Sequence, residues 1–191
     1  EGLMNQTFEE LLVSHCAPTL AGLKTGSLFC FGAAPPGSVR RLVCHWHRRL
    51  QPRGLSVVLL LERRAPRRSV VYVYRKSQLR LLLESEECRA FLRRCGYREE
   101  NTDGMLRQLA CRMAREKDFP HEIGVFLGYP LRDVVGFIEN RGQNFTCCGC
   151  WKSYGDPEAA QKRFECYQRC TACYMRMFAR GIPVEKMALP A

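Results

Sequence analysis

Cysteine side chains gather in one stretch of this chain, between Phe119 and Cys173, which also holds one histidine. Six of the twelve cysteines lie between Cys147 and Cys173, and the adjacent residues His121 and Glu122 precede them. Thiolates and imidazoles are ligands of zinc and of iron–sulfur clusters, and thiols are also nucleophiles and redox groups. The stretch therefore predicts metal, redox or nucleophilic chemistry, with reduced packing thiols as the alternative.

The candidate metal ligands are two Cys-x-x-Cys pairs, Cys147 with Cys150 and Cys170 with Cys173. The first pair lies in a Gly-containing loop. The second pair lies on one edge of the helix expected over residues 157–180. Four thiolates in this pattern are typical of zinc or of an iron–sulfur cluster, so either is a candidate cofactor.

Cys16 is a second candidate, as an activated nucleophile. It stands just before Pro18, which is expected to begin a second short helix. Amide N–H groups at a helix N-terminus stabilise a thiolate and lower the pKa of its thiol. A positive charge on Lys24 would act in the same direction.

His121 is the candidate general base for Cys16, with Glu122 or Asn140 as the group that orients the imidazole. The alternative is that both residues have structural roles only. His121 then hydrogen-bonds a nearby carbonyl group, and Glu122 interacts favourably with the dipole of a helix that begins at this point.

A binding pocket without catalysis is the third possibility. The segment HEIGVFLGYP (residues 121–130) would line it, and Trp151, Tyr154 and Phe126 would flank the cavity. Trp151, Tyr154 and Lys24 are accordingly the candidate residues for holding a cofactor or ligand.

The N-terminal half is expected to form a small sheet packed with helices. An apolar stripe at helical spacing predicts a helix over residues 38–50. The expected strands are short, apolar and β-branched, and span residues 27–31, 55–62 and 69–75. The last two strands form an antiparallel pair, and the first completes a three-stranded sheet.

The C-terminal half is expected to be mostly helical. Its candidate helices span residues 85–95, 102–116, 120–128, 131–140 and 157–180. The predicted fold class is therefore α+β. The chain has no long linker, which predicts one compact domain over residues 1–191. Its sheet-containing lobe would cover about 1–95, and its helical, cysteine-rich lobe about 96–191.

Composition limits the partners and the compartment. The net charge of +11 comes almost entirely from arginines spread along the chain, without the motifs of a sequence-specific nucleic-acid binder. No apolar run approaches the roughly 20 residues that cross a bilayer. The N-terminus shows no secretory signal, so we expect a cytoplasmic protein with reduced thiols, no membrane partner and no specific nucleic-acid target.

Three motifs resemble a known family. They are HCAPTLAGLKTGSLF (residues 15–29), FPHEIGVFLGYPLRDVVGFIEN (119–140) and CCGCWKSYGD (147–156). They resemble family 3793 of the domains of unknown function, an uncharacterised family from anaerobic Firmicutes. The resemblance implies a cytosolic protein of about this length in strict anaerobes, and it implies no activity or cofactor.

By position, the residues that match the family's motifs are Cys16, Lys24, His121, Glu122, Cys147, Cys150, Trp151, Tyr154 and Cys170. Cys148, Cys166 and Cys173 look particular to this chain. A metal site common to the family would then need a ligand other than Cys173, such as His121. The leading prediction remains a thiol-rich protein whose C-terminal cysteines bind metal or handle redox equivalents.

Overall fold

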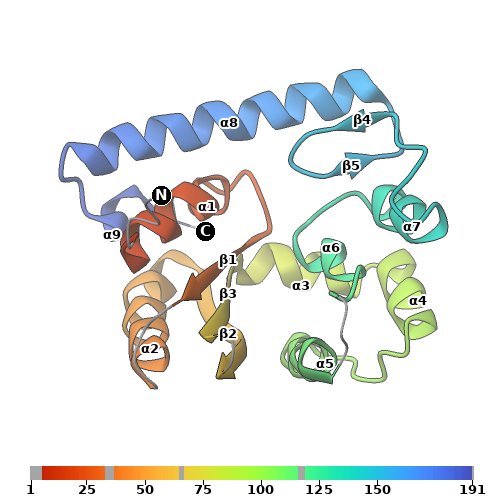
Figure 1. The fold of residues 1–191 in the computed structure, drawn as a ribbon, viewed down its shortest axis with the longest axis horizontal. Coiled ribbons are helices and arrows are strands. Elements are labelled where there is room, and N and C mark those ends of the chain that lie inside the picture. The colour runs from red at the N-terminus through yellow and green to blue at the C-terminus, as the bar shows by residue number, and fades with distance from the viewer. Residues whose placement is uncertain (1–5, 33–36, 65–66, 116–118, 191) are drawn as a thin grey trace. The chain divides into compact units, whose positions relative to one another are not determined.

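A three-stranded antiparallel sheet forms in the N-terminal half of the chain, and the C-terminal half is mostly helical (Figure 1). The α+β fold class predicted from the sequence is confirmed. The computed structural model describes residues 6–32, 37–64, 67–115 and 119–190. No helix in these ranges is both long and apolar enough to cross a membrane.

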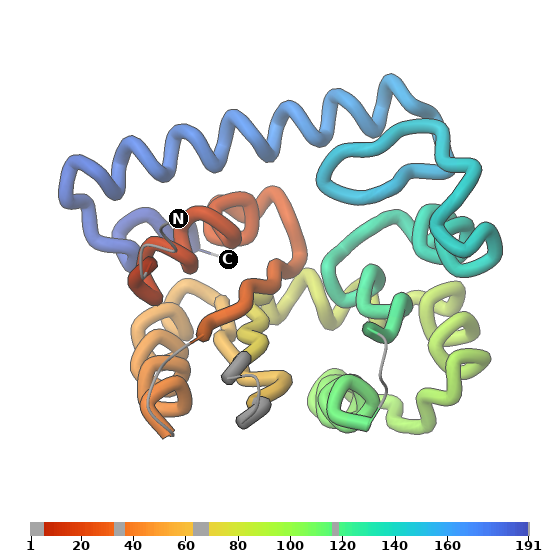
Figure 2. Tube along the Cα trace, in the orientation of Figure 1, coloured from red at the N-terminus to blue at the C-terminus, as the bar shows by residue number. Residues whose placement is uncertain are grey.

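The chain divides into two units. Unit 1 comprises residues 1–77 and 169–191, and unit 2 comprises residues 78–168. In Figure 2, unit 1 takes the red-to-yellow N-terminal part and the blue C-terminal end of the chain. The bounds differ from those of the two expected lobes, because the last 23 residues belong with the N-terminal sheet.

Unit 1 contains the sheet and the helices that pack on it. Its elements are α1 (Phe8–Leu20), β1 (Gly26–Gly32), α2 (Ser38–Leu50), the 3-10 helix η1 (Gln51–Arg53), β2 (Leu55–Arg64), β3 (Arg67–Arg75), the end of α8 (Pro157–Ala179) and α9 (Val184–Met187). The strand order is β1-β3-β2, with β3 antiparallel to both neighbours. The three strands and α2 agree with their predicted ranges to within two residues. The turn at 65–66, between the two paired strands, lies outside the described residues.

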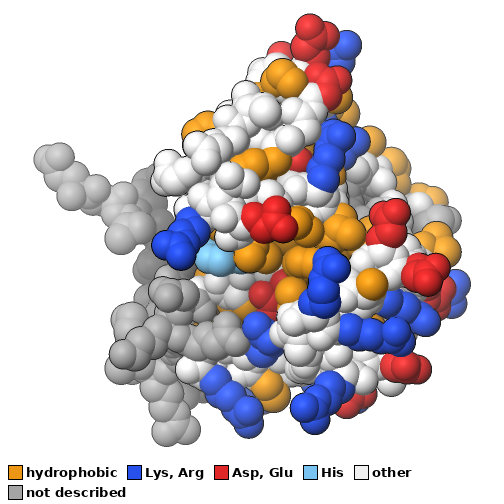
Figure 3. Space-filling view, turned by 90° about the vertical axis from the view of Figure 1, so that its right-hand side faces the viewer, with side chains coloured by type: hydrophobic (Ala, Val, Ile, Leu, Met, Phe, Trp, Pro, Cys, Tyr) orange, Lys and Arg blue, Asp and Glu red, His pale blue; other side chains and the backbone are white. Residues whose placement is uncertain are grey.

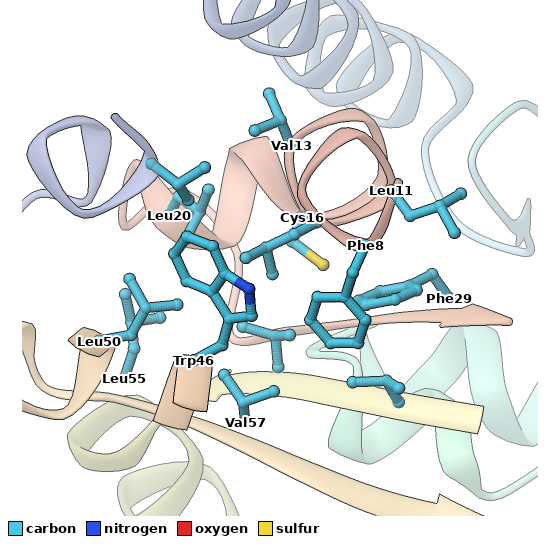
Figure 4. Packing of buried hydrophobic residues seen from close by; sticks show 14 of the residues in the cluster. Phe8, Leu11, Val13, Cys16, Leu20, Phe29, Trp46, Leu50, Leu55 and Val57 are labelled. Carbon is cyan, nitrogen blue, oxygen red and sulfur yellow. The ribbon is translucent and has the colours of Figure 1, made fainter. Parts of the chain in front are cut away.

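One face of this sheet forms the core of unit 1 with α1 and α2. Opposite pairs in the register, such as Phe29 with Val71 and Val57 with Val73, place β-branched and aromatic side chains on that face. Trp46 and the other apolar residues of α2 pack against them (Figure 4). The helical and strand periodicities of the sequence therefore converge on one cluster.

The helix α1 continues through Pro18, so the prediction of a second helix beginning there is wrong. Proline lacks an N–H group, which removes only the bond to the carbonyl of Ser14, and its fixed φ suits a helix. Pro18 stands in the last turn of α1, where its carbonyl accepts the N–H groups of Leu23 and Lys24 at 2.8 and 3.1 Å. The loss of one bond is therefore tolerated.

Arg75 is a buried cation at the end of β3, with 3% of its surface exposed. Its Nε donates to the Thr19 carbonyl at 2.8 Å, and one Nη donates to the carbonyls of Leu20 and Leu189 at 2.5 and 2.9 Å. Thr19 and Leu20 end α1, where the helix dipole favours positive charge. Burial lowers the pKa of Arg75. The guanidinium thus ties α1 and the C-terminal tail to the sheet.

Unit 2 is built from short helices and one small hairpin. Its elements are α3 (Lys76–Glu84, from its third residue), α4 (Glu86–Arg94), α5 (Thr102–Arg115), α6 (Ile123–Phe126), α7 (Leu131–Glu139), β4 (Cys147–Cys148), β5 (Lys152–Ser153) and the start of α8. The predicted end of α5 at Glu116 lies outside the described residues. The sequence did not predict the β4–β5 hairpin, because each strand has only two residues.

The helix expected over 120–128 shortens to α6. The backbone N–H groups of Ile123, Gly124 and Val125 bond to carbonyls three residues back, which is a tighter turn than an α-helix. Gly128 then takes a φ of 76°, which ends the segment in a conformation that favours glycine.

Replacing Arg75 with Met should destabilise the fold. Met keeps the apolar stem but leaves the carbonyl groups of Thr19, Leu20, Leu189 and Pro190 without their guanidinium donors, at a cost of about 2–4 kcal/mol of unfolding free energy. Urea denaturation followed by circular dichroism measures this. Arg41→Met, at an exposed position of α2, is the control and should change the free energy by less than about 0.5 kcal/mol. Equal values for the two variants would contradict the role of Arg75.

Candidate functional site

The structure places Cys16 inside α1, fully buried in the core of unit 1. Figure 4 shows its sulfur pointing into the apolar cluster, toward the rings of Phe8 and Trp46. Burial raises the pKa of the Cys16 thiol to about 12, and Lys24 lowers it only in part. No helix begins at Pro18, so the expected source of a low pKa is missing.

His121 and Glu122 lie in unit 2 and face different surroundings. The Glu122 side chain is buried. Its Oε1 is 2.8 Å from Arg112 Nε and accepts a hydrogen bond of 3.2 Å from the Tyr97 hydroxyl. His121 is exposed, with its ring edge-on to Phe137 at 4.9 Å between centroids. Glu122 therefore holds α6 to the α4–α5 region rather than orienting the imidazole.

The cysteine pairs fall in different units. Cys147 and Cys150 belong to the hairpin of unit 2, whereas Cys170 and Cys173 belong to the part of α8 in unit 1. Cys147 packs on the aromatic cluster of its own unit, and Cys170 packs on the core of unit 1. Over the described ranges, no three His, Cys, Asp or Glu side chains are grouped so as to hold a metal ion. The four-thiolate site stays a prediction.

A pocket of about 390 Å³ lies within unit 2. Its walls come from residues between 121 and 129, from one side of α7 and from the hairpin residues 148–152. Ile123, Val134 and Phe137 give it an apolar surface. Figure 3 is a space-filling view of one face of the molecule. Hydrophobic side chains gather at the centre of that face, and charged side chains surround them.

Asp133 fixes the hairpin wall of this pocket. It stands in the first turn of α7, where the helix dipole favours a carboxylate, and 3% of its surface is exposed. Its Oδ2 accepts a hydrogen bond from Trp151 Nε1 at 2.8 Å, and its Oδ1 accepts one from the Tyr154 backbone N–H at 2.9 Å. A charged acceptor makes both bonds strong. The carboxylate therefore sets the position of the indole.

Two aromatic rings pack against Trp151. Tyr129 stacks on it with 4.8 Å between centroids, and Phe164 meets it edge-on at 4.6 Å. Burial, and then the nearby Cys150 thiol, raises the pKa of Tyr129 to about 12, so its hydroxyl stays protonated near neutrality. Tyr129 and Trp151 both line the pocket and give it an aromatic wall, at which Trp151 exposes 9% of its surface.

Lys152 is the cation of the pocket lining. Its Nζ donates to the Gly142 carbonyl at 2.7 Å and lies 4.9 Å from the ring centroid of Phe145. These contacts leave donor capacity on an ammonium group that has three N–H bonds. Cys148 and Cys150, both exposed, add thiols to the same lining.

Two glycines allow close packing around α7. A Cβ atom on Gly124 would lie 2.8 Å from Val134, and one on Gly136 would lie 2.5 Å from the ring of Tyr154. Either methyl group would push an element of the site outward. Tyr154 thus packs on the back of α7, and its buried hydroxyl has no hydrogen-bond partner among the described residues.

The lining of the pocket in unit 2 differs in part from the one expected from the sequence. Trp151 and the segment that begins at His121 line it, whereas Tyr154 and the fully buried Phe126 do not. Lys24 belongs to unit 1. Asp133 and Lys152 were not among the residues predicted from the sequence. A lone acidic residue in the first turn of an apolar helix was the available signal for Asp133.

Cys16 should resist alkylation in the folded protein. A pKa of about 12 gives a thiolate fraction at neutral pH more than about a thousandfold below that of an ordinary thiol with a pKa of ~8.5. Timed labelling with iodoacetamide, followed by peptide mass spectrometry, compares it with the exposed Cys111. In denaturant both should react alike. Rapid labelling of Cys16 in the folded protein would instead support the activated-thiol hypothesis.

Asp133→Asn should loosen the hairpin. Both partners of the carboxylate are N–H donors, and an amide offers only one acceptor atom, so one bond is lost at a cost of about 1–3 kcal/mol. Urea denaturation measures the loss, and a shift in Trp emission reports the indole. Asp103→Asn, exposed in the first turn of α5, is the matched control. Equal effects at both positions would show that Asp133 acts only through the helix dipole.

Comparison with known proteins identifies a family. A family model described as "Protein of unknown function (DUF3793)" matches residues 12–188, which is most of the chain. No curated protein and no solved structure matches the chain. The match covers both units, including Cys16, the pocket and the hairpin cysteines. The chain therefore belongs to the DUF3793 family of proteins of unknown function.

Proposed function

We propose that this protein binds a compact, flat and mainly apolar small molecule in the pocket of unit 2. The observation that carries the proposal is the rigid Tyr129–Trp151 stack, which the Asp133 carboxylate anchors at the pocket wall. A preformed aromatic surface binds a ligand without the entropy cost of ordering its own side chains.

The dimensions of the pocket favour a compact ligand. A volume of about 390 Å³ is near the lower end of the ~300–1,000 Å³ that is usual for small-molecule sites. Ile123, Val134 and Phe137 offer dispersion contacts and no hydrogen bonds. A ring system that stacks beside Trp151 suits these walls better than a flexible polar chain.

The polar groups of the lining would orient such a ligand. Lys152, next to the indole in sequence, supplies N–H donors. The exposed His121 supplies a ring nitrogen from the segment of residues 121–129. A ligand with a hydrogen-bond acceptor at one edge would satisfy them. The exposed thiol of Cys148 is available to ligands with soft or electrophilic atoms.

We also propose a cytoplasmic location. Exposed cysteines occur in both units, among them Cys30, Cys44 and Cys111. A reducing compartment keeps such thiols free of unwanted disulfides, which supports the expectation from composition.

A thermal-shift screen with small aromatic fragments, followed by calorimetry, tests binding. Ligands that fit should stabilise the protein by about 2.7 kcal/mol at 100 times their dissociation constant. Cys148→Trp, which places an indole in the pocket lining, should weaken the binding of each hit at least about tenfold. Cys111→Trp, at an exposed position on α5, should leave affinity unchanged.

Two results would contradict the proposal. If no fragment stabilises the wild-type protein, the pocket does not act as a site for molecules of this kind. If hits bind Cys148→Trp as well as they bind Cys111→Trp, they occupy another part of the chain.

A further inference from the structure

The net charge of the chain is confined to unit 1. Residues 1–77 and 169–191 hold 16 Lys and Arg against 5 Asp and Glu, a net charge of +11. Residues 78–168 hold 14 of each kind, so unit 2 is formally neutral. The excess charge that looks evenly spread along the sequence is therefore concentrated by the fold. A field of one sign attracts a partner of the opposite sign.

Exposed arginines form stripes on two helices of unit 1. On α2, Arg41 and Arg48 are two turns apart and share one face. On and just after α8, Arg169, Arg176 and Arg180 follow at steps of seven and four residues, which also keeps them on one face. All five side chains belong to exposed residues.

The two helices that carry the stripes both contact α9, α8 through the hydrogen bond of 3.0 Å from the Tyr174 hydroxyl to the Met187 carbonyl. Arg49, at the end of α2, pairs with Glu185 of α9 at 2.5 Å. Leu50 of α2, Phe178 of α8 and Val184 of α9 pack in the same core cluster. Lys186 adds an exposed cation on α9 itself. We name the surface of Arg41, Arg48, Arg169, Arg176, Arg180 and Lys186 the basic surface.

The spacing of the basic surface suits a phosphodiester backbone. At a rise of 1.5 Å per residue, the stripe from Arg169 to Arg180 runs about 16 Å. This equals the axial length of about five phosphates on one DNA strand, at ~3.4 Å each. Arginine predominates, and its planar guanidinium binds phosphate oxygens in a bidentate manner.

An anionic membrane fits the same surface less well. Amphipathic helices that bind bilayers combine basic residues with exposed apolar ones. Among the described residues of unit 1, the exposed large hydrophobic side chains are Leu23 and Leu189, and neither lies on α2, α8 or α9. The surface therefore offers charge without apolar groups for insertion.

We propose that the basic surface of unit 1 binds the phosphate backbone of nucleic acid without reading base sequence. This agrees with the lack of a sequence-specific motif in the chain. It is independent of the pocket in unit 2, so either proposal stands without the other.

Fluorescence anisotropy with the full chain and two labelled DNA duplexes of about 20 base pairs and unrelated sequence tests this. The protein should bind both duplexes alike, with affinity falling steeply between 50 and 200 mM salt. The variant R41E/R48E/R176E should bind at least about tenfold more weakly at 50 mM salt. Its slope of log affinity against log salt should be shallower by about 2.7 if each arginine contacts one phosphate.

The matched control is R94E/R98E/R107E, which makes the same change of charge at exposed positions of unit 2. It should bind within about threefold of the wild-type protein. Circular dichroism melts check that both variants fold, and R41Q/R48Q/R176Q replaces the first variant if charge reversal prevents folding.

Three outcomes would overturn the proposal. The wild-type protein could fail to bind at 50 mM salt. The two variants could lose affinity equally, which would show an effect of net charge alone. The protein could bind vesicles with 30% phosphatidylserine at concentrations where neither duplex is bound, which would assign the surface to a membrane.

Discussion

The Asp133 carboxylate is the constraint on which the candidate site depends. The β4–β5 hairpin has two residues in each strand, too few to be stable alone. Asp133 compensates by accepting a hydrogen bond from a side chain and another from the backbone of the segment that follows the hairpin turn. Because α7 supplies this acceptor, the position of the Trp151 indole is fixed relative to a helix. The wall of the pocket that contains Trp151 is therefore anchored to α7.

Arg75 has the corresponding role in unit 1. It is a buried charge whose hydrogen bonds go to backbone carbonyls at the end of α1 and in the C-terminal tail. Such a cation is stable only while those carbonyls converge on it, since burying an unsatisfied charge costs several kcal/mol. The sheet, the first helix and the last residues of the chain are therefore linked, which explains why unit 1 joins both ends of the sequence.

Periodicity predicted the sheet, α2 and most helices because those elements bury one continuous apolar face. The prediction around Cys16 was wrong because Pro18 was expected to begin a new helix. A proline in the last turn costs α1 only one hydrogen bond, so the helix continues through it. Within the site, Trp151 and the segment from His121 were predicted. Asp133 and Lys152 were not, because their roles depend on contacts between segments that local patterns do not encode.

Whether each cysteine thiol is accessible and able to ionise depends on its burial and not on the motif in which it lies. Cys16 lies within the range that matches the family model, yet the apolar core around it disfavours the thiolate. Cys148 was not among the predicted ligands, yet it is exposed and lines the pocket. A nucleophile or ligand must be both accessible and able to ionise. By these two criteria Cys148, in the lining of the pocket of unit 2, is better suited than Cys16 to act as a nucleophile or ligand.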